Sequence, residues 1–323
     1  MAYHFPPIGG GGVQRSLKFA KYLPDFGILP IILTGSGKAE GRWTPDDRTM
    51  LSELPTDIPI CRVQDWEKDR ASLVAAGEAA VAQYKPQCIV ASMSPFQDAP
   101  IAAELSRRLR IPWIADLRDP WALDEFQVHS TRWHRAREHR KMARFLCSAS
   151  SVIMNTPEAA HRFRGAFASL ADKAQVRITN GYDAADFTSK TIPPRPGKFI
   201  IVHSGYFHSE IGLHQKRHAL QYRLLGRAER RVSLLPRSHF FLLQALECWR
   251  HSDPTIAENV RLICVGSLTE TDRQLVQQSP VKDLVELTGY LPHSDCLNYV
   301  READLLFLPM QKLPPGRRAT IGP

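Results

Sequence analysis

The stretch VELTGYLPHSDCLNYVREADLLFLPM, residues 285–310, carries the clearest fold signal in the chain. Its first apolar run stops at Gly289, where the backbone can turn sharply and approach a ligand. Its last run, residues 305–308, is continuously apolar and closed by Pro309, which predicts a strand buried on both faces. Between the runs, Ser294 and Asp295 predict the cap of a short helix. The apolar face of that helix is expected to consist of Leu297, Val300 and Ala303.

This strand–turn–helix–strand unit indicates where a ligand would bind. In a parallel sheet, residues 289–292 would lie at the carboxyl edge, which is the edge where open α/β folds bind ligands. The rest of the chain shows the same alternation of strands and helices, which favours a doubly wound parallel sheet. Strands are expected at residues 30–34, 88–92, 112–116, 152–155, 176–178, 199–205 and 260–266, and helices at 13–23, 100–109, 213–234 and 240–249.

The chain length indicates two domains. It has 323 residues, more than a single core usually serves. The proline-rich stretch at residues 191–198 is the best linker, and it separates a first domain at 1–190 from a second at 199–323. The first domain has no strand before Tyr3, and the second ends in a loop with no helix after it. We therefore expect two Rossmann-like domains, the first without its first strand and the second incomplete.

Composition limits the kind of partner. The formal charge is +9, which favours an anionic partner, namely nucleic acid, an acidic lipid surface or a phosphorylated small molecule. Basic residues cluster at 132–144 and 216–237, and each cluster contains one acidic residue. A solvated helix face explains either cluster as well as an anion-binding surface does. No apolar run approaches the roughly 20 residues of a membrane span, and no signal peptide is apparent. Six scattered cysteines without metal-ligand spacing predict buried free thiols in a cytoplasmic protein.

Two segments of the first domain could carry chemistry. Gly10, Gly11 and Gly12 precede a helix, where successive N–H groups can hold an anion, although a flexible loop without ligand is the simpler interpretation. Asp116, Arg118 and Asp119 would lie at the carboxyl end of a strand, and a carboxylate there could act as a base or orient a hydroxyl. A helix cap with a structural salt bridge is the alternative for this second segment.

The second domain offers a phosphate site. Ser204 and Gly205 end its first strand, where small residues would let a diphosphate lie against the backbone. Lys216 and Arg217 on the following helix could neutralise that charge. His214 and His218 are four residues apart, but no carboxylate or cysteine lies close by in sequence. Solvated histidines are therefore the favoured interpretation, and we expect neither a metal nor any other cofactor.

The chain resembles glycosyltransferase family 4, whose members have the two-domain GT-B fold. No single segment decides this resemblance, but the segments occur in the family's order through nearly the whole chain. They are residues 3–15, 116–121, 179–182, 202–205, 287–293 and 304–309.

The resemblance implies transfer of a sugar from a nucleotide-sugar donor to a cell-envelope or polysaccharide acceptor, with retention and without a metal. It places the donor diphosphate at Gly205 with Lys216 and Arg217. It places the nucleotide base of the donor at the backbone of Gly289, Tyr290 and Leu291. The first domain would hold a sugar or lipid-linked acceptor, and residues 10–12 would approach the donor phosphates. The basic faces would suit peripheral contact with the inner face of an anionic membrane.

The chain departs from the family at both ends. The family carries a closely spaced glutamate pair after the loop that here reads 316–323, whereas this chain has no glutamate after Glu302. We therefore expect a chain truncated at both ends, with its activity in question. Two alternatives stay open, a non-catalytic fragment or binding protein of the same fold and a basic nucleic-acid-binding α/β protein. Nucleic acid is the less favoured partner, because no known nucleic-acid-binding module is recognisable.

Overall fold

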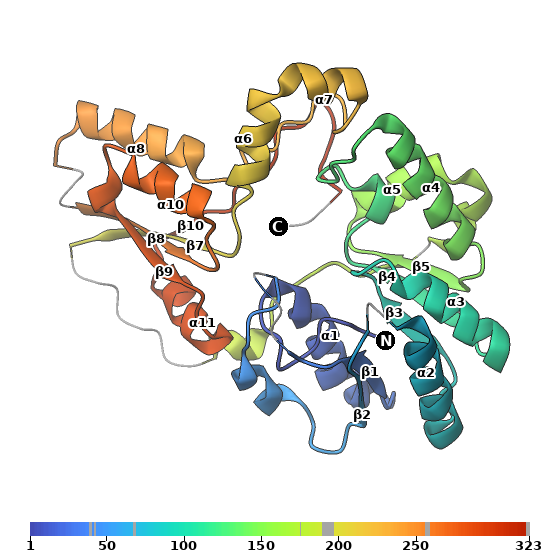
Figure 1. Ribbon diagram of the computed structural model, residues 1–323. Helices are drawn as coiled ribbons and strands as arrows, with labels where there is room; N and C mark the ends of the chain where they lie inside the picture. The colour runs from blue at the N-terminus through green and yellow to red at the C-terminus, as the bar shows by residue number, and fades with distance from the viewer. Residues whose placement is uncertain are drawn as a thin grey trace. The chain divides into compact units, whose positions relative to one another are not determined.

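The computed structural model of the protein describes residues 1–38, 41, 43–66, 69–174, 176–188, 197–255 and 259–320. The chain forms two compact units (Figure 1). Unit 1 comprises Met1–Gly181 with Arg318–Gly322, and unit 2 comprises Tyr182–Arg317. Both are α/β units with parallel sheets, as the sequence predicts. Of the predicted linker at 191–198, residues 191–196 lie outside the described residues.

Unit 1 alternates strands and helices. Its strands are β1 (Ile32–Gly35), β2 (Ile60–Val63), β3 (Ile89–Ser92), β4 (Trp113–Leu117), β5 (Ser151–Met154) and β6 (Val176–Arg177). Its α-helices are α1 (Gly11–Tyr22), α2 (Arg70–Tyr84), α3 (Asp98–Leu109), α4 (Arg132–Leu146) and α5 (Pro157–Ala166). The strands form a parallel pair β1-β2 and a parallel sheet in the order β3-β4-β5-β6. The short 3-10 helices η2 (Arg48–Glu53) and η3 (Trp121–Leu123) lie in its loops.

The first residues of the chain join these two sets of strands. The backbone N–H of Ala2 donates to the carbonyl of Leu33 in β1 at 3.0 Å, and the N–H of Ser92 in β3 donates to the carbonyl of Met1 at 2.9 Å. Residues 1–3 therefore occupy the position of a central strand between β1 and β3, although they are too short to be assigned as one. This is the position at which the sequence suggests that a strand is missing.

Unit 1 is completed by residues that follow unit 2 in the chain. The N–H of Thr320 donates to the buried carboxylate of Glu125 at 2.9 Å, and the hydroxyl of Thr156 donates to the carbonyl of Thr320 at 2.8 Å. Arg318 forms an ion pair with Glu158 at 3.3 Å. Thr320 is itself almost fully buried, so this segment belongs to the interior of unit 1.

Unit 2 contains one parallel sheet. Its strands β7 (Phe199–Ser204), β8 (Val260–Val265), β9 (Val285–Gly289) and β10 (Leu305–Leu306) are arranged in the order β10-β7-β8-β9. The chain thus moves outward from β7 to β9 and then returns to the other side of β7. Its α-helices among the described residues are α6 (Ser209–Arg217), α7 (Ala219–Leu225), α8 (Phe240–Ser252), α10 (Glu270–Gln277) and α11 (His293–Glu302).

Helices cover both faces of this sheet (Figure 1). One face packs Ile201, Leu262 and Cys264 against α8 and α10, and the other packs Ile200, Val202, Ile263 and Val265 against α11. The alternation follows from strand geometry, since successive side chains point to opposite faces. Apolar side chains on both faces explain the continuous apolar runs of β7 and β8.

The expectation of buried thiols holds for Cys264 alone among the six free cysteines, since Cys88, Cys147 and Cys248 are exposed. Three expectations about the secondary-structure elements are also corrected. Residues 305–308 are not buried on both faces, because Leu305, Leu306 and Leu308 are 46%, 52% and 57% exposed. The reason is that β10 is an edge strand paired only with β7. The helix expected at 213–234 is interrupted at His218, which separates α6 from α7, and ends before Gly226, whose left-handed backbone stops it.

The third correction concerns α11. It begins at His293 after Pro292, so Ser294 and Asp295 lie inside its first turn and do not cap it. The side chains that pack on the sheet are Cys296, Tyr299 and Ala303. The expected face of Leu297, Val300 and Ala303 is therefore rotated on the helix, and only Ala303 belongs to both sets.

Candidate functional site

The carboxyl edge of the second sheet is lined with glycine. Strands β7, β8 and β9 each run into a glycine at this edge, namely Gly205, Gly266 and Gly289. The N–H of Gly205 donates to the carbonyl of Val265 at 2.8 Å, and the N–H of Gly266 donates to the carbonyl of Gly289 at 2.9 Å. We refer to Gly205, Gly266 and Gly289 as the glycine row.

The glycine row is required by the local geometry. A Cβ atom on Gly266 would overlap the carbonyl oxygen of Gly205, and its φ of +147° is one that side chains disfavour. Gly289 also has a positive φ, +77°, but a Cβ there would meet no atom within 4 Å. Gly266 is thus needed because a side chain there would prevent the close contact between its backbone and that of Gly205. At Gly289, the absence of a side chain leaves the backbone accessible to a ligand.

The glycine row adjoins the point where the strand order reverses. The chain proceeds from β7 to β8 and β9 on one side and returns to β10 on the other, so the carboxyl ends of β7 and β10 flank a topological switch point. Ligands of open α/β sheets bind at such a point. Ser204 and Gly205 lie at this point, at the carboxyl end of β7.

His203 links the two strands at the switch point. Its Nδ1 lies 2.9 Å from the carbonyl oxygen of Phe307, and its ring stacks on Phe207 with centroids 4.1 Å apart. Burial lowers the pKa of His203 to about 4, so the ring is neutral at pH 7. Since a carbonyl oxygen can only accept, Nδ1 must carry the proton, and Nε2 is left as an acceptor.

The other residues that the sequence predicts for this site, Ser204, Tyr290 and Leu291, lie at the same edge of the sheet. The hydroxyl of Ser204 is exposed and lies 2.9 Å from the Cys296 thiol, whose pKa is raised by burial. Leu291 packs on the α11 face of the sheet, and Tyr290 lies half-buried directly after Gly289. The structure therefore brings Ser204, Gly205 and Gly289 together with these two residues at one edge.

Lys216 and Arg217 are placed elsewhere. Both lie in the last turn of α6, about 10 Å further along the helix axis than Ser209, at 1.5 Å per residue. The Lys216 ammonium lies 5.2 Å from the ring centroid of Phe240. The structure does not bring these two cations to the glycine row, because α6 leads away from the sheet edge (Figure 1).

In unit 1, the predicted glycines and the predicted arginine meet. Helix α1 starts at Gly11 with Gly10 as its N-cap and no capping side chain. The guanidinium of Arg118 donates to the carbonyl of Gly12, and a Cβ on Gly12 would lie 3.2 Å from its nitrogen atoms. Burial lowers the pKa of Arg118. The first turn of α1 therefore presents backbone N–H groups beside a buried cation.

Asp116 is engaged in the interior of unit 1. It is fully buried and accepts from the Arg15 guanidinium, with the shortest contact at 2.7 Å. Arg15 also donates to the carbonyl of Ile178 at 2.8 Å and to Asn180 at 3.3 Å. Asp119 is 38% exposed and lies 3.8 Å from the Nε atom of Arg118. This geometry favours a structural salt bridge for Asp116 and leaves Asp119 as the more accessible carboxylate.

Three residues at these edges have contacts that the sequence does not predict. Gly266 could have been found, since it ends an apolar strand as Gly205 and Gly289 do. The roles of Arg15 and His203 could not have been found from the sequence, because their partners lie 101 and 104 residues away in the chain.

Comparison with solved structures identifies the architecture. The chain is similar to Alr3699/HepE of Anabaena in complex with UDP and glucose, with a TM-score of 0.59 and 17% identity over 95% of this chain and 71% of that one. It is also similar to sucrose-phosphate synthase from Thermosynechococcus elongatus, with a TM-score of 0.56 and 15% identity over 96% and 75% of the two chains. The chain has the GT-B fold.

The same fold is shared by proteins of another kind. UDP-GlcNAc 2-epimerase from Methanocaldococcus jannaschii aligns with a TM-score of 0.51 and 10% identity over 90% of this chain and 74% of that one. No protein-family model and no curated protein sequence matches the chain. Within the part of the chain that the structure describes, no helix is long and apolar enough to cross a membrane.

Proposed function

We propose that this protein is a glycosyltransferase of the family 4 type that transfers a sugar from a nucleotide-sugar donor, with UDP as the nucleotide. The observation that carries the proposal is the glycine row at the switch point of unit 2. What supports the choice of ligand is that structures sharing the fold were determined with UDP and with UDP-glucose. Retention of configuration and independence of metals are part of the proposal.

In this proposal the physical task of unit 2 is to hold the departing diphosphate. Positive charge and oriented N–H groups stabilise the charge that develops on a leaving phosphate. Gly205 and Gly289 would let the diphosphate and the base lie against the backbone, with Ser204, Tyr290 and Leu291 beside them. Lys216 and Arg217 remain the proposed diphosphate cations, although they would have to reach back from the last turn of α6.

Unit 1 would hold the acceptor, a sugar or a lipid-linked sugar. The α1 turn at residues 10–12, with Arg118 and Asp119, is the proposed contribution of unit 1 to the reaction. We place the protein in the cytoplasm, in peripheral contact with an anionic membrane surface. The support is α4, which presents six basic residues and a Trp133 side chain that is 72% exposed.

Isothermal calorimetry with UDP, UDP-glucose and a GDP-sugar tests the donor site. We expect saturable binding of the UDP compounds. A Gly289→Ala variant should weaken this binding without unfolding the protein, because the added methyl group would meet no described atom within 4 Å and its φ of +77° costs only about 1 kcal/mol. Gly27→Ala, with a φ of +73° and likewise no described atom within 4 Å of the added methyl group, is the matched control in unit 1. Absence of saturable binding at millimolar UDP-sugar would overturn the proposal.

A 2-epimerase of UDP-N-acetylglucosamine is the second candidate, because two of the similar structures carry that activity in their names. The two functions differ in their need for an acceptor. Incubation with UDP-N-acetylglucosamine alone, followed by chromatography, separates them. Formation of the 2-epimer without acceptor would favour the epimerase, and transfer that depends on added acceptor would favour the glycosyltransferase.

A further inference from the structure

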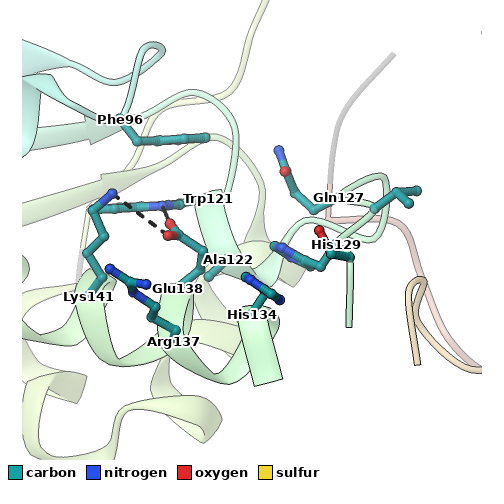
Figure 2. Close-up of a pocket in the computed structure, with 11 residues that line it drawn as sticks. Phe96, Trp121, Ala122, Gln127, His129, His134, Arg137, Glu138 and Lys141 are labelled. Atoms are coloured by element: carbon teal, nitrogen blue, oxygen red, sulfur yellow. Dashed lines mark hydrogen bonds and ion pairs between the residues drawn. The ribbon is translucent and has the colours of Figure 1, made fainter. Parts of the chain in front are cut away.

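Unit 1 contains a cavity of about 440 Å³ that the glycine row does not explain. Figure 2 shows it between the loop carrying Phe96, η3 and the first turns of α4. The lining residues that matter for its chemistry are Phe96, Trp121, His129, Arg137, Glu138 and Lys141. A volume of this size falls within the range of small-ligand sites, and it suits one or two sugar rings.

One wall of the cavity is an aromatic pair. The ring of Phe96 stacks on that of Trp121, with centroids 5.1 Å apart and planes inclined by 2° (Figure 2). Trp121 is held in place by donation from its indole N–H to Glu138 at 3.3 Å. Its φ is +50°, a strained value for a residue other than glycine, and such strain persists where the surroundings fix the residue at a functional site.

The facing wall is basic. Arg137 and Lys141 lie four residues apart, hence on one face of α4, and both line the cavity. Lys141 is 3.7 Å from Glu138, whereas Arg137 is exposed and makes no hydrogen bond or ion pair with a described residue. Burial lowers the pKa of His129, whose buried Nε2 has no hydrogen-bond partner within the described residues. The ionised lining groups therefore leave a net positive charge.

These features specify a ligand that is part sugar and part anion. The faces of a sugar ring carry C–H groups that pack on an aromatic ring, and Phe96 offers the partly exposed face of the stacked pair. A guanidinium without a protein partner binds phosphate oxygens with two parallel hydrogen bonds. Neutral sugars would leave Arg137 without a counter-charge.

We propose that this cavity is the acceptor subsite and that the acceptor is a phosphorylated sugar, with its ring on Phe96 and its phosphate at Arg137 and Lys141. The proposal rests on the proposed glycosyltransferase function. The phosphate could belong to a soluble sugar phosphate or to the diphosphate that joins a sugar to a lipid carrier. Both sources present the same chemistry to the cavity.

Binding to the full chain tests the subsite. The probes are glucose, glucose 6-phosphate and glucose linked through diphosphate to a short, water-soluble prenyl chain, each titrated by calorimetry in the absence of UDP. We expect no measurable binding of glucose and saturable binding of at least one phosphorylated probe. Preference for glucose 6-phosphate would indicate a soluble acceptor, and preference for the prenyl diphosphate would indicate a lipid-linked one.

Variants on one helix locate the binding. Arg137→Gln should weaken the binding of the phosphorylated probe about tenfold or more, since a hydrogen bond to a charged group is lost. Arg140→Gln is the matched control, because Arg140 is also exposed on α4 but does not line the cavity. Phe96→Leu should weaken glucose 6-phosphate but leave inorganic phosphate binding within about twofold. Melting temperatures equal to that of the parent would show that all three variants are folded.

Three outcomes would overturn the inference, namely no saturable binding of either phosphorylated probe, equal binding of glucose, or equal effects of Arg137→Gln and Arg140→Gln. A separate UDP titration of the same protein distinguishes this failure from failure of the proposed function. UDP binding without sugar-phosphate binding would sink only the acceptor subsite. Sugar-phosphate binding without UDP binding would leave the cavity intact and sink the glycosyltransferase proposal.

Discussion

A methyl group added at Gly266 would overlap the carbonyl oxygen of Gly205 and force an L side chain into a φ of +147°. We expect Gly266→Ala to lower the free energy of unfolding by about 2–4 kcal/mol, through steric overlap and backbone strain together. Guanidinium denaturation measures the loss. Gly289→Ala is the comparison, with a cost of about 1 kcal/mol because only its φ is unfavourable. Equal stabilities of the two variants would contradict this account of the glycine row.

The buried imidazole of His203 makes stability depend on pH. Its pKa is about 4 in the folded protein, against an ordinary value of 6.5, because burial disfavours the charged ring. Between these values the unfolded chain binds a proton that the folded chain does not, so this contribution to the free energy of unfolding falls as pH drops from about 6.5 to 4. Above pH 6.5 it is fully present.

Denaturation of the parent and of His203→Phe across this pH range isolates that residue. His4 and His129, whose pKa values are also lowered by burial, titrate in both proteins and cancel in the comparison. His239 lies close enough to His203 to interact with its charge, so His239→Phe in both backgrounds removes its contribution. The charged groups around His203, Arg237 and Asp272, are likewise common to both. We expect a shallower pH dependence for the variant. Parallel curves would show that His203 does not titrate in this way.

Among the elements, α1 is held against β4 by the buried pair of Arg15 and Asp116. Arg15→Met would leave the Asp116 carboxylate buried without its counter-charge, and we expect a loss of about 3–5 kcal/mol. Arg15→Lys should recover only part of it, since one ammonium cannot also reach Ile178 and Asn180 as the guanidinium does. Chemical denaturation provides the measurement. A loss below about 1 kcal/mol for Arg15→Met would mean that the pair contributes little.

Helix α11 should be sensitive on one face only. Tyr299 packs against the sheet core of unit 2, whereas Leu297 belongs to no core cluster. We expect Tyr299→Ala to lower the free energy of unfolding by about 2–3 kcal/mol and Leu297→Ala by less than about 1 kcal/mol. Chemical denaturation of both variants under identical conditions measures the two losses. A larger loss for Leu297→Ala than for Tyr299→Ala would support the helix face that the sequence pattern suggests.

The elements that the sequence predicts well are those whose residues carry their own signal. Residues 199–205 and 260–266 predict buried strands because both faces are apolar and a glycine ends each run. Residues 305–308 carry the same apolar signal, yet Leu305 and Leu306 are exposed, since a pattern does not reveal what lies over a strand. The pairing of Arg15 with Asp116 and the contact of Arg118 with Gly12 depend on chain segments brought together only by folding.

For the molecule as a whole, the charge of +9 fits a nucleotide-sugar and a nucleic acid alike, and the salt dependence of binding separates the two. Contact of basic surfaces with DNA releases counterions, so the affinity should fall by about 10³-fold or more between 50 and 200 mM salt. Binding of UDP through backbone N–H groups should fall far less over the same range. Fluorescence titrations with duplex DNA and with UDP test this expectation. Tight, strongly salt-dependent DNA binding that added UDP-sugar does not affect would favour the nucleic-acid alternative.

The burial of Thr320 against Glu125 has a consequence for synthesis on the ribosome. Unit 1 lacks this segment until residues 182–317, which form unit 2, have been translated. At elongation rates of about 5–20 residues per second, the delay is roughly 7–27 s. During this interval the nascent first unit exposes to chaperones and proteases the carboxylate of Glu125 and the hydroxyl of Thr156, the N-cap residue of α5. Ribosome-stalled chains should therefore resist proteolysis in this region only after Thr320 has left the exit tunnel.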